Sequence, residues 1–168
     1  MLSKRKKLSF ETIEDAELGT LTFADYGDTA SYSCKLTLPV SSEKVDVFFE
    51  TTSKEHRPTD KQKQFFKSVL DNYNSLVKKI APVVSAAINE TDYKDKKIGK
   101  SQLQLVSLMV PQVDTEEFNW DITFKATSLK KVFIIVCMDR LTPLSSMIEK
   151  DERQPFTKLL LRLLNGSS

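Results

Sequence analysis

Residues 59–89, TDKQKQFFKSVLDNYNSLVKKIAPVVSAAIN, form the longest periodic segment of the chain and decide its expected fold. Apolar residues recur in it at spacings of three and four, the period of a helix with one buried face. These residues are Phe66, Val69, Leu70, Tyr73, Leu76, Val77, Ile80, Val84 and Ala87. The residues that face away from this stripe are Lys63, Lys67, Asp71, Ser75 and Lys79. Thr59 or Asp60 is suited to cap the first turn, because a side-chain oxygen there accepts from an unpartnered backbone amide.

Pro82 interrupts this helical pattern. Inside a helix, proline removes a backbone hydrogen bond and clashes with the preceding turn, at a cost of about 3 kcal/mol. At the first turn of a new helix, its missing N–H is harmless. Because the apolar stripe continues through Val83, Val84 and Ile88, the sequence predicts either a kink at Pro82 or a second helix that begins there.

Three strand-like segments precede this helix and three follow it. The segments before it are Gly19–Asp25, Tyr32–Leu38 and Val45–Phe49. The segments after it are Gln102–Val110, Phe118–Thr127 and Val132–Met138. Phe156–Leu164 places its leucines on one side and predicts a short C-terminal helix, which Gly166 ends. The expected fold is α+β, a mostly antiparallel sheet of about six strands with the long central helix packed on one face.

Val132–Met138 is apolar at every position, a composition that suits a strand buried on both faces. The long helix is expected to cover one face of this strand. Phe156–Leu164 then covers part of the other face, or that face is exposed and forms an interface, because large exposed apolar patches are rare on monomers. The second possibility predicts a homodimer through the apolar C-terminal face.

The length of 168 residues predicts one folded domain, spanning residues 18–168, after a basic and then acidic N-terminal arm, residues 1–17. Four positive charges of this arm lie together at Lys4–Lys7, so the rest of the chain is close to neutral despite a net charge of +2. We therefore expect neither a nucleic-acid nor a membrane partner. No apolar run approaches the roughly 20 residues of a membrane span, and no signal peptide follows the basic start, so the expected location is cytoplasmic.

Residues with catalytic or metal-binding chemistry are few in this chain. Its only histidine, His56, lies in a polar loop, and the two cysteines, Cys34 and Cys137, lie in apolar strand-like segments. Standard zinc sites need three or four clustered ligands, and an apolar setting suppresses thiol reactivity. The four glycines are scattered, so no glycine-rich phosphate loop exists. The sequence predicts no catalytic residue, no cofactor and no metal.

Asp114, Glu116, Glu117 and Asp121 form the densest acidic cluster of the chain. A solvated turn has this composition. A recognition patch for a basic partner protein has it as well, since complementary charge raises the rate and specificity of association. These four residues are the candidate partner-binding site, and an enzyme with an unrecognised carboxylate site remains an alternative.

The order of these segments resembles a known group of domains. The segments concerned are Leu-Gly-Thr-Leu-Thr-Phe at 18–23, Leu-Pro at 38–39, Val-Asp-Val-Phe-Phe-Glu at 45–50, Thr-Asp-Lys-Gln at 59–62 and the strand that contains Trp120. In layout, residues 18–139 resemble small uncharacterised bacterial domains of the DUF2004 and DUF6985 type. Those domains are associated with polymorphic-toxin loci and are presumed to be immunity proteins. The resemblance implies a non-catalytic protein that binds another protein, such as a toxin domain.

Overall fold

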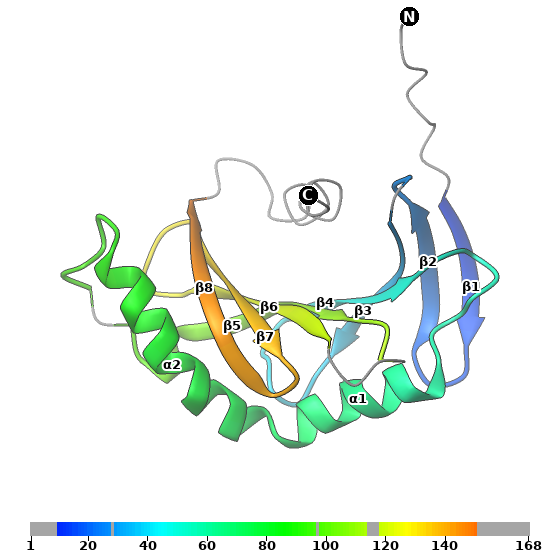
Figure 1. Ribbon diagram of the computed structural model, residues 1–168, viewed down its shortest axis with the longest axis horizontal. Helices are drawn as coiled ribbons and strands as arrows, with labels where there is room; N and C mark the ends of the chain where they lie inside the picture. The colour runs from blue at the N-terminus through cyan, green and yellow to red at the C-terminus, as the bar shows by residue number, and fades with distance from the viewer. Residues whose placement is uncertain (1–9, 28, 97, 114–117, 151–168) are drawn as a thin grey trace, which may run out of the picture.

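A computed structural model of the chain describes residues 10–27, 29–96, 98–113 and 118–150. It contains one eight-stranded sheet and two α-helices (Figure 1). The strands are β1 (Phe10–Asp15), β2 (Gly19–Asp25), β3 (Ala30–Thr37), β4 (Lys44–Thr51), β5 (Leu103–Val110), β6 (Asn119–Ala126), β7 (Val132–Asp139) and β8 (Thr142–Lys150). The helices are α1 (Asp60–Asp71), α2 (Tyr73–Asn89) and the 3-10 turn η1 (Lys100–Gln102).

The strands lie in the sheet in the same order as in the chain. Every neighbouring pair is antiparallel except β4 and β5, which run parallel. Parallel neighbours cannot be joined by a hairpin and need a long crossover. The helices α1 and α2 supply this crossover, and Figure 1 shows both of them along one side of the curved sheet.

The strand registers divide the side chains between two faces of the sheet, because successive residues of a strand point in opposite directions. We call the face under α1 and α2 the helix face. Its fully buried strand residues include Leu21, Tyr32, Val47, Phe49, Leu108, Ile122, Phe124, Ile134 and Val136. The helix residues in the same core are Phe66, Val69, Tyr73, Leu76, Val77, Ile80, Val84 and Ile88. We call the opposite side of the sheet the second face.

Gln62 joins the start of α1 to the parallel strand pair. Its Oε1 accepts from the Thr59 amide at 3.0 Å, and Thr59 Oγ1 accepts from the Gln62 amide at 3.2 Å, which completes a capping box. Gln62 Nε2 donates to the carbonyl oxygens of Glu50 at 2.8 Å and Pro111 at 3.1 Å. Since Glu50 lies near the end of β4 and Pro111 follows β5, one buried side chain holds both carboxyl ends against the helix.

The expected six strands around one long helix are wrong, because the sheet has eight strands and the crossover consists of two helices. The two strands that the sequence pattern did not predict are the edge strands. Residues 10–15, assigned above to an N-terminal arm, form β1 and pair with β2. Residues 142–150, to which the sequence pattern assigned no strand, form β8, and Ser146 Oγ donates to the Val83 carbonyl of α2 at 3.1 Å. Edge strands with one packed face need few apolar residues, which explains their weak signal.

The helical segment breaks at Asn72 and not at Pro82. The Asn72 side chain donates to the Ser68 carbonyl at 2.8 Å, and such local side-chain bonds compete with helix continuation. Pro82 stays inside α2 at an exposed position, where water can reach the carbonyl group that a proline leaves without a donor. The predicted C-terminal helix at residues 156–164 lies outside the described residues.

Replacing Gln62 with leucine should lower the free energy of unfolding by about 2–4 kcal/mol, since three side-chain hydrogen bonds worth about 0.5–1.5 kcal/mol each are lost. The matched control is Gln64→Leu, an exposed position on the same helix, where a change within about 0.5 kcal/mol is expected. Urea unfolding followed by circular dichroism measures both. Equal losses for the two variants would contradict the role given to Gln62.

Candidate functional site

His56 lies in the exposed loop between β4 and α1, beside a polar cavity of about 350 Å³. The cavity opens at the carboxyl ends of β4 and β5, a place where open sheets with parallel strands often bind ligands. His56 Nδ1 lies 2.9 Å from Thr52 Oγ1 and 3.2 Å from Ser53 Oγ, so hydroxyl groups and not a carboxylate orient the ring. Thr51 Oγ1 donates to the His56 carbonyl at 2.7 Å. The polar groups of this cavity therefore bond largely to one another, and the hydroxyls of Thr52 and Ser53 share one nitrogen of the His56 ring.

The two cysteines occupy opposite faces of the sheet. Cys34 on β3 is buried on the helix face, and burial raises the pKa of its thiol to about 11. Cys137 on β7 is half-buried on the second face, four strands away, so no disulfide joins the two. Because the thiolate is the nucleophile and the metal ligand, Cys34 is poorly suited to either role at neutral pH.

Residues 10–27, 29–96, 98–113 and 118–150 contain no group of three or more histidine, cysteine or acidic side chains that could hold a metal ion. No helix among them is long and apolar enough to cross a membrane.

The predicted acidic cluster is only partly described. Asp121 lies on β6, on the second face opposite Cys137, where it is half-buried and has an interaction partner. Asp114, Glu116 and Glu117 lie outside the described residues. Whether these four acids act together as a partner-binding site stays a prediction.

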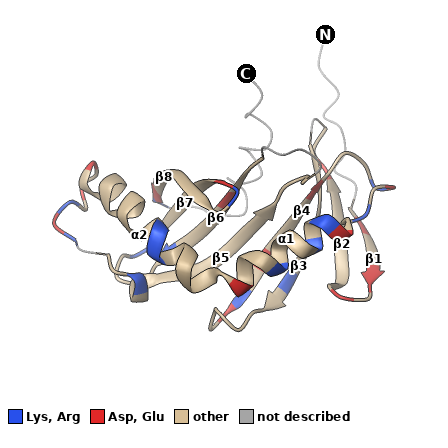
Figure 2. Ribbon diagram, turned by 60° about the horizontal axis from the view of Figure 1, so that its bottom comes forward, with Lys and Arg blue, Asp and Glu red and all other residues tan. Residues whose placement is uncertain are grey.

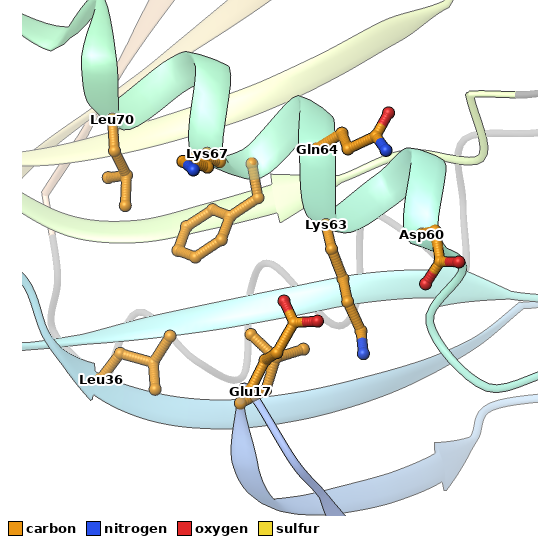
Figure 3. Close-up of a pocket in the computed structure, with 9 residues that line it drawn as sticks. Glu17, Leu36, Asp60, Lys63, Gln64, Lys67 and Leu70 are labelled. Carbon is orange, nitrogen blue, oxygen red and sulfur yellow. The ribbon is translucent and has the colours of Figure 1, made fainter.

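A groove between α1 and the turn that joins β1 to β2 has a volume of about 460 Å³ (Figure 3). Its floor is apolar and its rim is charged. The apolar residues are Leu18, Leu36, Phe66 and Leu70, and the charged residues are Glu17, Asp60, Lys63 and Lys67. In Figure 3, Lys63 extends from α1 toward the opposite wall, which carries Glu17 and Leu36. We call this cavity the α1 groove.

An ion pair between Lys63 and Asp15 fixes the two walls of the α1 groove. Lys63 Nζ lies 2.8 Å from Asp15 Oδ2 and 3.1 Å from Oδ1, and the two side chains are only 16% and 12% exposed. Asp15 Oδ1 also accepts from the backbone amides of Glu17 at 3.0 Å and Leu18 at 3.1 Å. The hydrogen bond from Lys63 lowers the pKa of Asp15, and the same bond raises the pKa of Lys63. Both groups are therefore charged at neutral pH.

The sequence pattern did not reveal this ion pair. Lys63 was expected to face away from the apolar stripe, and Asp15 to lie in a loosely held arm. The structure brings them together across 48 positions of sequence, and Figure 2 shows basic residues of α1 and acidic residues of β1 at this end of the sheet. A charged residue beside an apolar helical stripe gives no sign of a distant partner, so no local signal could have found the pair.

Comparison of the chain with known protein families, curated proteins and solved structures finds no match. The resemblance to immunity-type domains therefore stays a prediction.

Asp15→Asn should lower the free energy of unfolding at pH 7 by about 1–2 kcal/mol, between the values for exposed and fully buried pairs. The folded pKa of Asp15 is depressed, so its stabilisation is present above its unfolded pKa of about 3.9 and is lost as pH falls through the folded pKa. The difference in free energy of unfolding between wild type and Asp15→Asn should therefore disappear in acid. Urea unfolding between neutral pH and strong acid measures this difference.

The control for this prediction is the exposed pair between Lys35 and Asp46, 2.9 Å apart. Lys35→Met should change stability by less than about 0.5 kcal/mol. If the difference in free energy of unfolding between wild type and Asp15→Asn stays constant with pH, the charge of Asp15 does not stabilise the fold.

Proposed function

We propose that the chain is a non-catalytic protein-binding domain that engages its partner protein through the α1 groove. The observation that carries the proposal is the apolar floor of this groove, flanked by charges of both signs. Protein interfaces have this arrangement, with an apolar centre that excludes water and a polar rim that sets specificity. The lining extends from Asp60 to Leu70 along α1, about 15 Å at the helical rise, which suits an extended protein segment.

The charges of the groove support binding over catalysis. A lysine that acts as a base or nucleophile needs a lowered pKa, whereas the hydrogen bond to Asp15 raises the pKa of Lys63. Asp15 has a lowered pKa and is already bonded to Lys63 and to two backbone amides, so it is a weak proton acceptor. These groups are suited to a rigid, charged surface.

The partner in this proposal is another protein and neither nucleic acid nor membrane. A toxin domain is the most concrete partner, because the layout of the chain resembles immunity-type domains. A second copy of the chain is the alternative partner. The mixed rim, with Glu17 and Asp60 beside Lys63 and Lys67, fits a partner segment that carries charges of both signs.

Lys67→Glu should reduce capture of the partner about fivefold, because reversing a rim charge replaces an attraction with a repulsion. Lys67 is exposed, so the substitution leaves the fold intact. The control is Lys79→Glu, the same change at an exposed position of α2 that does not line the groove. Affinity capture from the source cells, quantified by mass spectrometry, compares the three proteins.

The expected result is a set of proteins retained by wild type and Lys79→Glu and depleted with Lys67→Glu. Equal capture by all three proteins would contradict binding through the α1 groove. A light-scattering mass of twice the chain that falls only in Lys67→Glu would identify a second copy as the partner.

A further inference from the structure

Three large side chains of the second face are almost fully buried. Phe48 on β4, Met109 on β5 and Ile135 on β7 are 4%, 7% and 6% exposed. The registers place them on this side of the sheet, because Phe48 pairs with Met109 while their neighbours Val47 and Leu108 belong to the helix-face core. Burial of this extent on an open sheet face requires a cover.

The described helices and the loop after β4 do not supply that cover. The stripes of α1 and α2 pack on the helix face, as shown by their place in one core with Leu21, Phe49 and Phe124. The loop after β4 lies on the same side, since Lys54 pairs with Glu11 of β1, and Glu11 is in register with Phe23 of the helix face. The second face therefore needs a further occupant.

The buried residues belong to a strip of uncharged, mostly apolar side chains that crosses β4 to β8, which we call the apolar strip. Phe48 and Met109 are adjacent on β4 and β5. One register row further along, Ser107, Thr123, Ile135 and Met147 are neighbours on β5, β6, β7 and β8. Met147, at the β8 end of this row, is 44% exposed, so the strip reaches solvent at this edge.

Acidic side chains surround this strip. On β4 to β8, the carboxylates of the second face are Asp46, Glu50, Asp121, Asp139 and Glu149, and the lysines among them are Lys44 and Lys125. A helix with an apolar side and basic flanks complements such a surface.

We propose that the second face is the docking surface for residues 156–164 of the same chain. This segment, Phe-Thr-Lys-Leu-Leu-Leu-Arg-Leu-Leu, contains two basic and no acidic residues. At helical spacing, Phe156, Leu159, Leu160, Leu163 and Leu164 fall on one side, and Lys158, Leu161 and Arg162 fall on the other. The apolar side matches the strip, and the net positive charge of the segment is opposite in sign to the excess of carboxylates around it.

The length of chain after β8 fits this docking. The described residues end at Lys150, and the five residues 151–155 span at most about 17 Å when extended. Strands lie about 4.8 Å apart, so this connection reaches from β8 to β5. A nine-residue helix is about 13.5 Å long, sufficient to cross the strip between β7 and β4. Docking within one chain therefore needs no second copy.

Cys137 provides a reporter for the cover, because it lies on the second face beside Asp121 and Ser145. The variant Leu160→Glu places a charge on the apolar side of the segment and should weaken docking. The rate at which a maleimide labels Cys137 should then rise about tenfold, because losing one buried leucine changes a docking equilibrium by about this factor. The matched control is Leu161→Glu, the same change on the opposite side, which should leave the rate unchanged.

Cys34 reports on the integrity of the fold in the same experiment, because this buried thiol has a pKa of about 11 and stays unlabelled while the helix-face core is intact. Faster labelling of Cys137 alone in Leu160→Glu supports the proposal. Equal Cys137 rates in the two variants would overturn it.

A second measurement tests docking without disturbing the leucine stripe of a folded protein. A benzophenone amino acid in place of Phe156, an aromatic residue on the apolar side of the segment, leaves the leucines unchanged and should cross-link within one chain to peptides of β4 to β8 at the mass of the monomer. Cross-links at the mass of a dimer would assign the second face to another copy of the chain and overturn the proposal. Cross-links confined to α1 or α2, or none at all, would overturn it as well. Both experiments are independent of the α1 groove, so their failure would leave the proposed function standing.

Discussion

The parallel pairing of β4 with β5 is the constraint on which the rest of this structure depends. Seven pairings make up the sheet, and this one alone cannot be closed by a hairpin. The chain therefore crosses over through α1 and α2, and the crossover places both helices on the same face. Gln62 fixes the start of the crossover, because it bonds the carbonyl groups at the ends of both strands and caps α1. The helix face thus becomes the core, and α1 and α2 leave the second face to be covered by something else.

The same constraint explains why the α1 groove lies near the edge of the sheet. Because α1 starts at the end of β4, its first turns lie against the β1–β2 turn, where Lys63 meets Asp15. β1 pairs with β2 alone and has mostly exposed side chains, so such an edge strand has little apolar packing to hold it. Its link to α1 through Asp15 therefore contributes to both the stability of the edge and the width of the groove. Rigidity of this kind favours binding, since less conformational freedom is lost on association.

Sequence reasoning located the interior of this fold better than its edges. The segments 32–38 and 118–126 alternate because one side of each enters the core. They match β3 and β6, except that Leu38 and Phe118 each lie one residue outside the strand. β1 and β8 were missed because their second sides carry Glu14, Ser145 and Glu149, which resemble a loop in composition. The sequence predicted the helix break at Pro82, because proline is the residue least compatible with a helix interior. The structure has the break at Asn72, whose side chain bonds to the Ser68 carbonyl.

The candidate site was less predictable than the fold, and the reason is physical. Periodicity reports which side of an element is apolar, but it carries no information about which distant residue meets a charged side chain. The α1 groove depends on such a meeting across β1 and α1, as the polar cavity near His56 depends on the adjacency of β4 and β5. Of the predicted acidic cluster, Asp121 alone is placed, on the face that the C-terminal segment is proposed to cover.

Nuclear Overhauser contacts between β4 and β5 test the central claim most directly. The parallel register predicts contacts that advance together along both strands, from Asp46 with Ser107, through Val47 with Leu108, to Phe49 with Val110. Contacts that run in opposite directions, or a β4 without contacts to β5, would contradict the crossover and with it the assignment of the two faces. Measurement on the isotopically labelled full chain decides between these outcomes.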